Sequence, residues 1–217
     1  MTGGGFPVQP GESPDESPHR YPSFEPVPED ARRVFLRYSR LLLGYELDRR
    51  RDDPGADEPA PPSGYPVLEE PFGFFVTLRY RGELRGCIGS ITTEDALVHS
   101  IRRRTLDAAF HDPRFSPLKH HELAAITIEH SILSTPREEA DADAIRLGED
   151  GVILQVGTAR SVFLPEVASQ QGWDLTTTLR ALARKAGLRE DAWRRPEARL
   201  SIFQTQHYGE QRSKDHD

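Results

Sequence analysis

The sequence predicts an α+β fold, a mainly antiparallel sheet flanked by helices, on two observations. Segments that alternate apolar and polar residues are interspersed with segments of helical periodicity, without the steady strand and helix alternation of a parallel sheet. The first two predicted strands are separated only by Arg81-Gly82, a two-residue turn candidate, which makes them an antiparallel hairpin. No internal repeat is visible, so the pattern does not indicate a solenoid.

The N-terminal part predicts a disordered leader over residues 1–28, because its many Gly, Pro, Ser and Glu residues bury too little apolar surface to order it. Apolar residues then recur among arginines at helical spacing, which predicts a helix over 30–50. Residues 52–63 are rich in Pro, Asp and Glu and predict a mobile surface loop. We expect one domain over 29–208 and a charged tail over 209–217.

The middle of the chain predicts a hairpin, a helix and a third strand. The helix ends before Asp112-Pro113, because the residue before a proline disfavours the helical conformation. In the third strand, Ile126, Ile128 and His130 share one face and the polar residues between them share the other. The predicted ranges are 73–80 and 83–88 for the hairpin, 93–110 for the helix and 125–133 for the strand.

The last third of the chain predicts two more strands, a helix and a final strand. The two strands occupy 151–157 and 160–165, and Pro165 ends their pairing. Asp174 is a candidate N-cap for the helix, and Gly187 is its candidate C-cap. The final strand is predicted over 200–208.

Composition limits the class of protein. The chain has 217 residues, of which 36% are hydrophobic, enough for one medium domain or a domain with a smaller lobe. A single cysteine rules out an internal disulfide framework and favours a reducing compartment, and no apolar run is long enough for a membrane helix. We therefore expect a soluble cytoplasmic protein. The net charge of -7 argues against nucleic-acid binding, although Arg102-Arg103-Arg104 and Arg194-Arg195 are local basic spots.

The only cysteine is the strongest candidate for chemistry. It lies in the hexapeptide Leu84-Arg85-Gly86-Cys87-Ile88-Gly89. Gly86 and Gly89 let backbone or a ligand approach the sulfur, and the Arg85 guanidinium can favour the nucleophilic thiolate. Arg85 and Cys87 also share a strand face by alternation. The alternative is that Cys87 is a buried packing residue, which is the common role of a free cysteine.

Other side chains are candidates for the wall of the same site. His111 could serve as a base for the thiol, and Asp112 and Arg114 follow the helix close to the end of the sheet. Glu129 lies on the polar face of its strand. His120-His121 has no third ligand at a suitable spacing, so we predict no metal site and no cofactor.

Several ordered blocks of the sequence resemble the AMMECR family, called AmmeMemoRadiSam system protein A in bacteria. The similarity covers about residues 31–208 and includes the cysteine hexapeptide. The matching blocks are Gly82 to Ile91, Ala108 to Leu118, Gly151 to Leu154, Phe163 to Ala168, Gln171 to Trp173 and Arg184 to Leu188, followed by Trp193.

This resemblance implies an α+β fold with a larger and a smaller lobe and a cleft at the cysteine motif. It also implies an association with a Memo-type protein and a radical S-adenosylmethionine protein. Relatives often carry a second cysteine where this chain has Ala183, so a two-thiol redox mechanism is excluded, and Glu166 stands where glutamine is frequent. Two function classes stay open: an accessory or substrate-binding component, and a thiol-dependent enzyme that uses Cys87 as nucleophile.

Overall fold

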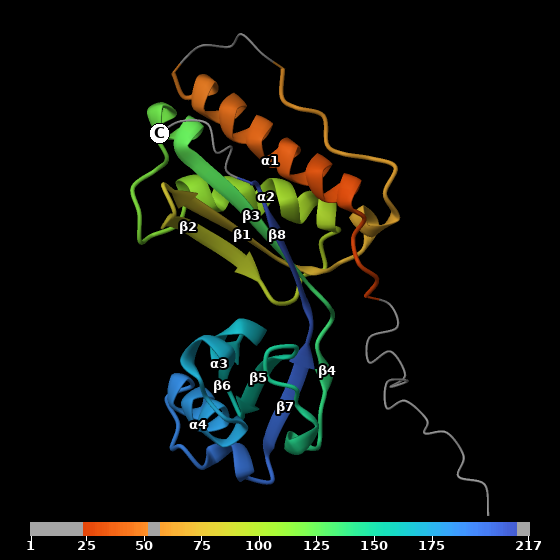
Figure 1. Cartoon of the computed structure of the whole chain (residues 1–217), viewed down its shortest axis with the longest axis vertical. Helices are drawn as coiled ribbons and strands as arrows, with labels where there is room; N and C mark the ends of the chain where they lie inside the picture. The colour runs from red at the N-terminus through yellow and green to blue at the C-terminus, as the bar shows by residue number, and fades with distance from the viewer. Residues whose placement is uncertain (1–23, 52–56, 212–217) are drawn as a thin grey trace, which may run out of the picture.

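The computed structural model describes residues 24–51 and 57–211. The chain forms two lobes, each built on a four-stranded antiparallel sheet (Figure 1). The predicted α+β class is confirmed, with two sheets where the sequence predicted one. The chain passes from the larger lobe to the smaller one and returns for its last strand, so that strand lies beside a strand more than seventy residues earlier.

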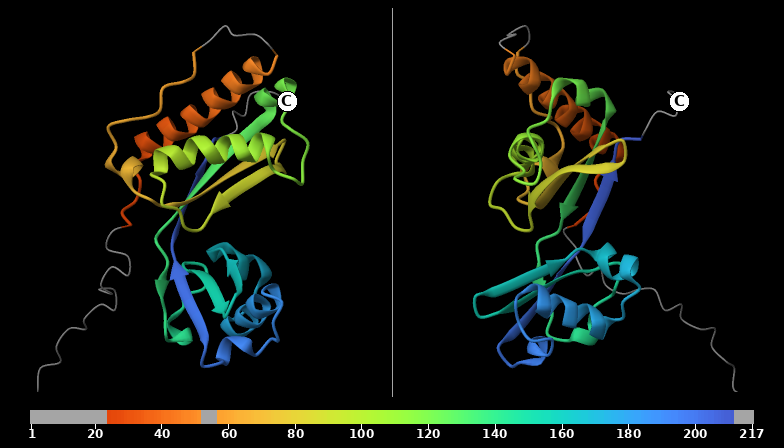
Figure 2. Two further views of the ribbon diagram at one scale, coloured as in Figure 1. Left: turned by 180° about the vertical axis from the view of Figure 1, so that it is seen from behind. Right: turned by 90° about the vertical axis from the view of Figure 1, so that its left-hand side faces the viewer.

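The larger lobe contains α1 (Glu29–Arg49), α2 (Leu97–Phe110) and the sheet of order β2-β1-β3-β8. Both helices cover the same face of the sheet (Figure 2). Alternate residues of the central strand, Phe74, Val76 and Leu78, are buried beneath them. The strands are β1 (Gly73–Tyr80), β2 (Glu83–Ser90), β3 (Ile126–Leu133) and β8 (Thr205–Gly209).

The smaller lobe contains the sheet of order β4-β7-β5-β6, with α3 (Pro165–Gln171) and α4 (Leu175–Lys185). Leu179 and Leu182 of α4 pack on the sheet in a second core, separate from the core of the larger lobe. Asp174 caps α4 as predicted, since its carboxylate accepts a hydrogen bond from the Thr177 N–H at 2.7 Å. The strands are β4 (Arg137–Glu138), β5 (Gly151–Val156), β6 (Ala159–Phe163) and β7 (Ala198–Phe203).

The lobes meet through apolar side chains and a pair of crossing segments. Leu133 of the larger lobe and Phe203 and Ile153 of the smaller lobe form a buried cluster, against which Phe75 packs. Where the segments cross, the Ser134 N–H donates to the Gln204 carbonyl at 3.0 Å, and the Gln204 N–H donates to Ser134 Oγ at 2.9 Å. The predicted strand 200–208 is therefore divided at Gln204 into β7 and β8, which belong to different sheets.

Local turn chemistry explains two other differences from the sequence prediction. The helix predicted from residue 93 begins at Leu97, because the Thr93 hydroxyl accepts the Asp95 N–H at 3.0 Å and stabilises a turn instead. Pro165 does end β6, but it also starts α3, which the sequence analysis did not predict. Proline suits the first helical position, where its missing N–H would have no partner.

The hairpin contains a bulge that decides which residues of β2 face the core. Arg81 and Gly82 have φ of 53° and 92°, the left-handed conformation of a two-residue hairpin turn. Tyr80 opposes Glu83, so regular pairing would place Cys87 opposite Val76 on the buried face. One extra residue, Arg85, shifts the register, and Cys87 instead opposes Thr77.

The ends of the predicted domain need two corrections. Phe24 and Val27 are buried in the larger core, so residues 24–28 belong with the domain and not with the predicted leader; residues 1–23 lie outside the described residues. At the other end, Glu210 extends the pairing of β8, since its N–H donates to the Ile128 carbonyl at 3.0 Å. Within the predicted loop, residues 57–63 have no regular secondary structure, and residues 52–56 are not described.

A truncation that begins at Glu29 is expected to lower the free energy of unfolding by about 2 to 4 kcal/mol, since it removes two buried apolar side chains. Phe24 packs edge-on against Phe72 at 5.5 Å between ring centroids, and the Val27 N–H donates to the Gln206 side chain at 2.8 Å. Urea unfolding measures the change. A truncation that begins at Phe24 is the matched control and should unfold like the full chain; equal loss in both would contradict the assignment.

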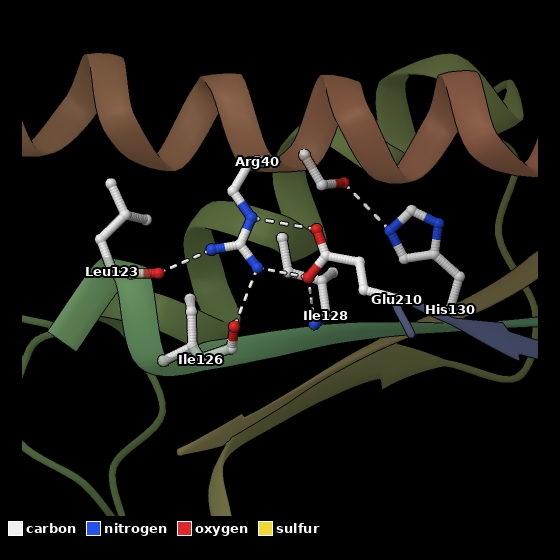
Figure 3. Close-up of polar contacts among 7 residues, drawn as sticks. Arg40, Leu123, Ile126, Ile128, His130 and Glu210 are labelled. Atoms are coloured by element: carbon white, nitrogen blue, oxygen red, sulfur yellow. Dashed lines mark hydrogen bonds and ion pairs between the residues drawn. The ribbon is translucent and has the colours of Figure 1, made fainter. Parts of the chain in front are cut away.

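Two polar clusters lie between α1 and the sheet (Figure 3). The Arg40 guanidinium binds the Glu210 carboxylate and the carbonyls of Leu123 and Ile126, while Glu210 also accepts the Ile128 N–H at 2.9 Å. This cluster joins α1 to the start of β3 and to the residue that follows β8. The second cluster is centred on His130.

His130 is completely buried on the core face of β3, as its alternation predicted. Its Nε2 lies 3.0 Å from Ser39 Oγ, which in turn lies 2.8 Å from the Thr105 hydroxyl. The rings of Phe74 and Tyr208 pack against its ring at 5.0 and 5.5 Å. Its Nδ1 has no hydrogen-bond partner among the described residues. Burial lowers the pKa of His130 to about 3.

Candidate functional site

The sheet face turned away from α1 and α2, here called the outer sheet face, carries most of the polar candidates. The alternation that buries Ile128 and His130 turns Glu129 and Ser131 of β3 to this face. Thr77 and Arg79 of β1 lie beside them, and His207 of β8 pairs with Ser131. A thiol, hydroxyls, a carboxylate, a guanidinium and an imidazole therefore share one surface.

Cys87 is half-buried on this face, and its sulfur accepts a hydrogen bond from the Thr77 hydroxyl at 3.3 Å. Thr77 opposes both Cys87 and Glu129, so these two are separated by two strand spacings of about 5 Å each. Glu129 is thus beyond hydrogen-bond reach of the thiol. Among the described residues, no His, Asp or Glu side chain bonds to the sulfur.

Asp112 and Arg114 hold the backbone of Cys87 at the free edge of the sheet. The Asp112 carboxylate accepts the Cys87 N–H at 2.9 Å, and the Arg114 guanidinium donates to the Cys87 carbonyl at 3.1 Å. The two side chains also pair with each other at 2.7 Å. Together they occupy the backbone groups that another strand would use, which blocks pairing of β2 with a further strand at this point.

Asp112 and Arg114 stabilise each other in their charged forms. Hydrogen bonds from Arg114 hold the pKa of the Asp112 carboxyl well below its usual range, and the Cys87 N–H contributes in the same direction. The Asp112 side chain is only 2% exposed. Hydrogen bonding to Asp112 is the main cause that raises the pKa of Arg114, and the Cys87 side chain contributes in the same direction.

Arg85, the other predicted catalytic residue, is engaged elsewhere. Its guanidinium donates to both carboxylate oxygens of Glu122, at 2.8 and 3.1 Å, and to the Ser116 carbonyl at 2.9 Å. Both side chains of this ion pair are 12% exposed. The Arg85 hydrogen bonds lower the pKa of Glu122. Arg85 therefore anchors the bulge to the loop after α2 and to the 3-10 helix at His120–Ala125.

The two glycines of the motif serve close packing. A Cβ on Gly86 would lie 2.1 Å from the Ala108 carbonyl oxygen of α2. A Cβ on Gly89 would lie 2.3 Å from both the Phe74 carbonyl oxygen and the Phe75 ring. Gly86 therefore allows the helix to approach β2, and Gly89 makes room for Phe75 on the outer sheet face.

The remaining predicted residues do not contact the thiol by any hydrogen bond in the described part of the chain. His111 is 62% exposed and its Nδ1 lies 3.2 Å from Asp107. Glu129 accepts a hydrogen bond from Arg79 at 2.8 Å. The structure thus brings together Cys87, Asp112 and Arg114, and places Glu129 on the same surface as the thiol but apart from it.

Sequence reasoning missed Thr77, the hydrogen-bond partner of the thiol, and the pair of Ser131 and His207, which lie 3.1 Å apart. Alternation along β1 does place Thr77 on the face of the strand that points away from the core. Its pairing with Cys87 was not readable, because the bulge at Arg85 changes the register. His207 required the pairing of strands more than seventy residues apart.

A groove of about 430 Å³ lies where the lobes meet and includes His207 at one end. Glu149, Glu166 and Thr205 also line it, whereas none of the predicted site residues does. Nowhere in the ranges 24–51 and 57–211 do three His, Cys, Asp or Glu side chains converge as a metal site would require. No helix in those ranges is long and apolar enough to cross a bilayer.

The basic triplet on α2 is neutralised by neighbouring acids. Arg102 pairs with Glu58 at 2.7 Å and Arg103 with Asp95 at 2.8 Å. Arg104 pairs with Asp107 at 3.3 Å. The triplet therefore does not form the unpaired basic surface that binds a phosphate backbone.

Similar proteins come from archaea. One from Methanothermobacter thermautotrophicus is 36% identical over 194 residues, which covers 86% of this chain and 98% of the relative. One from Thermoplasma acidophilum is 38% identical over 159 residues, which covers 70% of this chain and 77% of the relative. Each of these two relatives therefore matches more than two thirds of the chain.

A solved structure shows the same fold. The crystal structure of an uncharacterized protein from Pyrococcus horikoshii superposes with a TM-score of 0.68 and 30% identity, covering 82% of this chain and 90% of that one. The AMMECR1 family profile matches residues 40–208, which include the smaller lobe, most of the larger lobe and all the predicted site residues. The cysteine hexapeptide and the Asp112 and Arg114 pair that holds it lie within that match, and the chain belongs to the AMMECR1 family.

Proposed function

We propose that the protein is a non-catalytic accessory or substrate-binding component of a system that also contains a Memo-type protein and a radical S-adenosylmethionine protein. Its working surface is the part of the outer sheet face around Cys87, together with Arg114 at the sheet edge. Bacterial relatives resemble one member of such a three-part system, which supports the choice of these two proteins as partners. In this proposal the protein acts in the cytoplasm, where its thiol stays reduced.

The observation that carries the proposal is the environment of the sulfur. A nucleophilic cysteine is commonly activated by a base within hydrogen-bond reach. Here the hydrogen bond to the sulfur comes from the Thr77 hydroxyl, a neutral donor, and no base bonds to it among the described residues. The backbone on both sides of the thiol is held by Asp112 and Arg114. A rigid, half-exposed surface of this kind is suited to recognition.

A thiol-dependent enzyme with Cys87 as nucleophile is the second candidate. One observation favours it: the Arg114 guanidinium donates to the Cys87 carbonyl at 3.1 Å, which places a cation beside the residue that carries the thiol. A nearby cation stabilises a thiolate relative to a thiol. The two candidates differ in the expected reactivity of the thiol and in the effect of its replacement on partner binding.

The first test measures binding of the purified Memo-type and radical S-adenosylmethionine proteins of the same organism by biolayer interferometry. Cys87→Ser and Arg114→Gln are expected to weaken binding of at least one partner by about tenfold. Arg199→Gln is the control, because Arg199 pairs with Glu138 on the exposed surface of the smaller lobe. Unchanged binding by both site variants would exclude this surface as the partner site.

The second test separates recognition from catalysis by the rate of iodoacetamide alkylation between pH 6 and 9. Cys87 is the only cysteine, so the rate reports on one residue. A recognition site predicts a native rate no faster than that of the urea-denatured chain at every pH. If the native chain is alkylated faster than the denatured chain at pH 6, and Arg114→Gln lowers that rate, the thiol-dependent enzyme is the correct function and the recognition site is wrong.

A further inference from the structure

A hollow of about 520 Å³ on the smaller lobe gathers basic and aromatic side chains away from the outer sheet face. It lies between the middle of α4 and the segment that includes the 3-10 helix Ala192–Arg194. Its volume falls within the range of small-molecule sites. The residues that line it are Arg180, Arg189, Glu190, Asp191, Trp193 and Arg194.

The charges in this hollow do not cancel. Glu190 pairs with Arg184 at 3.3 Å, and Asp191 pairs with Arg189 at 3.4 Å. Each of the two acids therefore already has an arginine partner. Arg194 has no carboxylate partner within the described residues, in contrast to the three consecutive arginines of α2, which all do. Arg180 forms no salt bridge among these residues, and it interacts with Asp174 only through their charges. The hollow is a positive spot on a chain whose net charge is -7.

Trp193 orients one of these two arginines. The Arg194 guanidinium stacks over the Trp193 ring, with its carbon 4.4 Å from the ring centroid. Trp193 is itself held, because it packs against the core of the smaller lobe. Stacking covers the flat face of the guanidinium and leaves its N–H groups at the edge, where they fit the oxygens of a phosphate in a bidentate manner. The side chain is thus partly ordered before a ligand binds.

We propose that this hollow binds a small molecule that carries a phosphate or pyrophosphate group. Arg194 donates to the phosphate oxygens from its stacked position, and Arg180 supplies the second positive charge across the hollow. Arg189, shared with Asp191, adds to the positive field. This proposal is independent of the function proposed for the surface around Cys87, because the hollow shares none of its residues.

The chain provides its own reporter for the test. It has two tryptophans, and Trp173 packs against Phe163 outside the hollow, so Trp173→Phe leaves Trp193 as the single fluorophore. In this background, titration with sodium pyrophosphate at constant ionic strength is expected to change the Trp193 fluorescence saturably, with a Kd below about 1 mM. Calorimetric titration of the unsubstituted protein gives the same Kd without relying on the substitution.

Matched variants identify the arginines. Arg180→Gln and Arg194→Gln are each expected to weaken pyrophosphate binding by about tenfold, whereas Arg199→Gln, which alters a paired arginine on the same lobe, leaves it unchanged. ATP and inorganic phosphate, titrated in parallel, distinguish a nucleotide from a free phosphate as the natural source of the group. No saturation by about 10 mM of any of the three, or equal loss in the Arg199→Gln variant, would overturn the site. Tighter binding of a single-stranded oligonucleotide than of pyrophosphate would overturn the small-molecule assignment.

Discussion

Lowering the pH from 7 to 5 is expected to remove about 2 kcal/mol from the free energy of unfolding through His130 alone. Burial lowers the pKa of this imidazole to about 3 from its ordinary 6.5. The unfolded chain therefore binds a proton at pH 5 that the folded chain does not bind. The loss continues as the pH falls toward 3, where the contribution of His130 reaches about 4 kcal/mol.

The surroundings of His130 explain why the folded protein keeps it neutral. Its ring is enclosed by Phe74 and Tyr208, and its Nε2 meets only the Ser39 hydroxyl. The neighbouring His207 lowers the pKa of His130 further, in the same direction as burial. Protonation would therefore place an uncompensated charge in the core, which is the costly outcome that drives acid unfolding.

Urea unfolding at pH 7, 6 and 5 measures the effect, with His130→Gln as the test variant. Glutamine places a non-titrating amide near the position of Nε2, so it can still meet Ser39 while it removes the proton uptake. The slope of stability against pH should flatten in this variant. His111→Gln makes the same substitution at an exposed position and serves as the control for the change of side chain. Four carboxyls among the described residues have a lowered pKa and lose their stabilising contribution mainly below pH 5: Glu46, Asp112, Glu122 and Asp174. Equal slopes in all three proteins would contradict the assignment.

Replacing Gly86 by alanine is expected to destabilise the protein by about 3 kcal/mol or more. The new methyl group would lie 2.1 Å from the Ala108 carbonyl oxygen. This neighbour is backbone within α2, so it cannot rotate away as a side chain would. Relief requires α2 to move off the sheet, and Ala108 and Phe110 are part of the buried face that holds it there.

Gly44→Ala is the matched control, since it adds the same methyl group at a glycine within a helix of the same lobe. A Cβ on Gly44 would lie 3.8 Å from Leu123, an ordinary contact, and alanine favours a helix over glycine. This substitution is expected to stabilise the protein by about 0.5 to 1 kcal/mol. Thermal unfolding of both variants gives the comparison. A small effect of Gly86→Ala would show that α2 and β2 can separate without loss of stability. Close packing would then not explain Gly86, and a contact with a ligand would again be a candidate role.

The parts of the fold that were predicted correctly depend on short-range periodicity. The helical spacing in α1 and the alternation in β3 each reflect burial on one side of one element, which the local sequence records directly. The turn at Arg81 and Gly82 was also readable, because glycine supports the left-handed backbone that a two-residue hairpin needs. The approach of Asp112 and Arg114 to the sheet was predicted in outline from the helix that ends before them.

Other features depend on choices among partners that periodicity does not record. The single strand predicted over 200–208 serves two sheets, because the hydrogen bonds between Gln204 and Ser134 divide it at the junction of the lobes. The buried contacts of Phe24 and Val27 lie in a Pro-rich stretch whose composition resembles that of a disordered leader. Arg85 precedes the cysteine by two residues in the sequence, yet its ionic partner, Glu122, lies 37 residues further on.

The sequence by itself determined the α+β class, most of the helices and strands, the family and the position of the single thiol. Only the tertiary structure decided the environment of that thiol. A bulge of one residue at Arg85 turned Cys87 from the core face to the outer sheet face, where it meets Thr77. The physical reason is that side-chain direction in a strand has a period of two, so one extra residue reverses it, and the residues that hold the bulge come from distant parts of the chain.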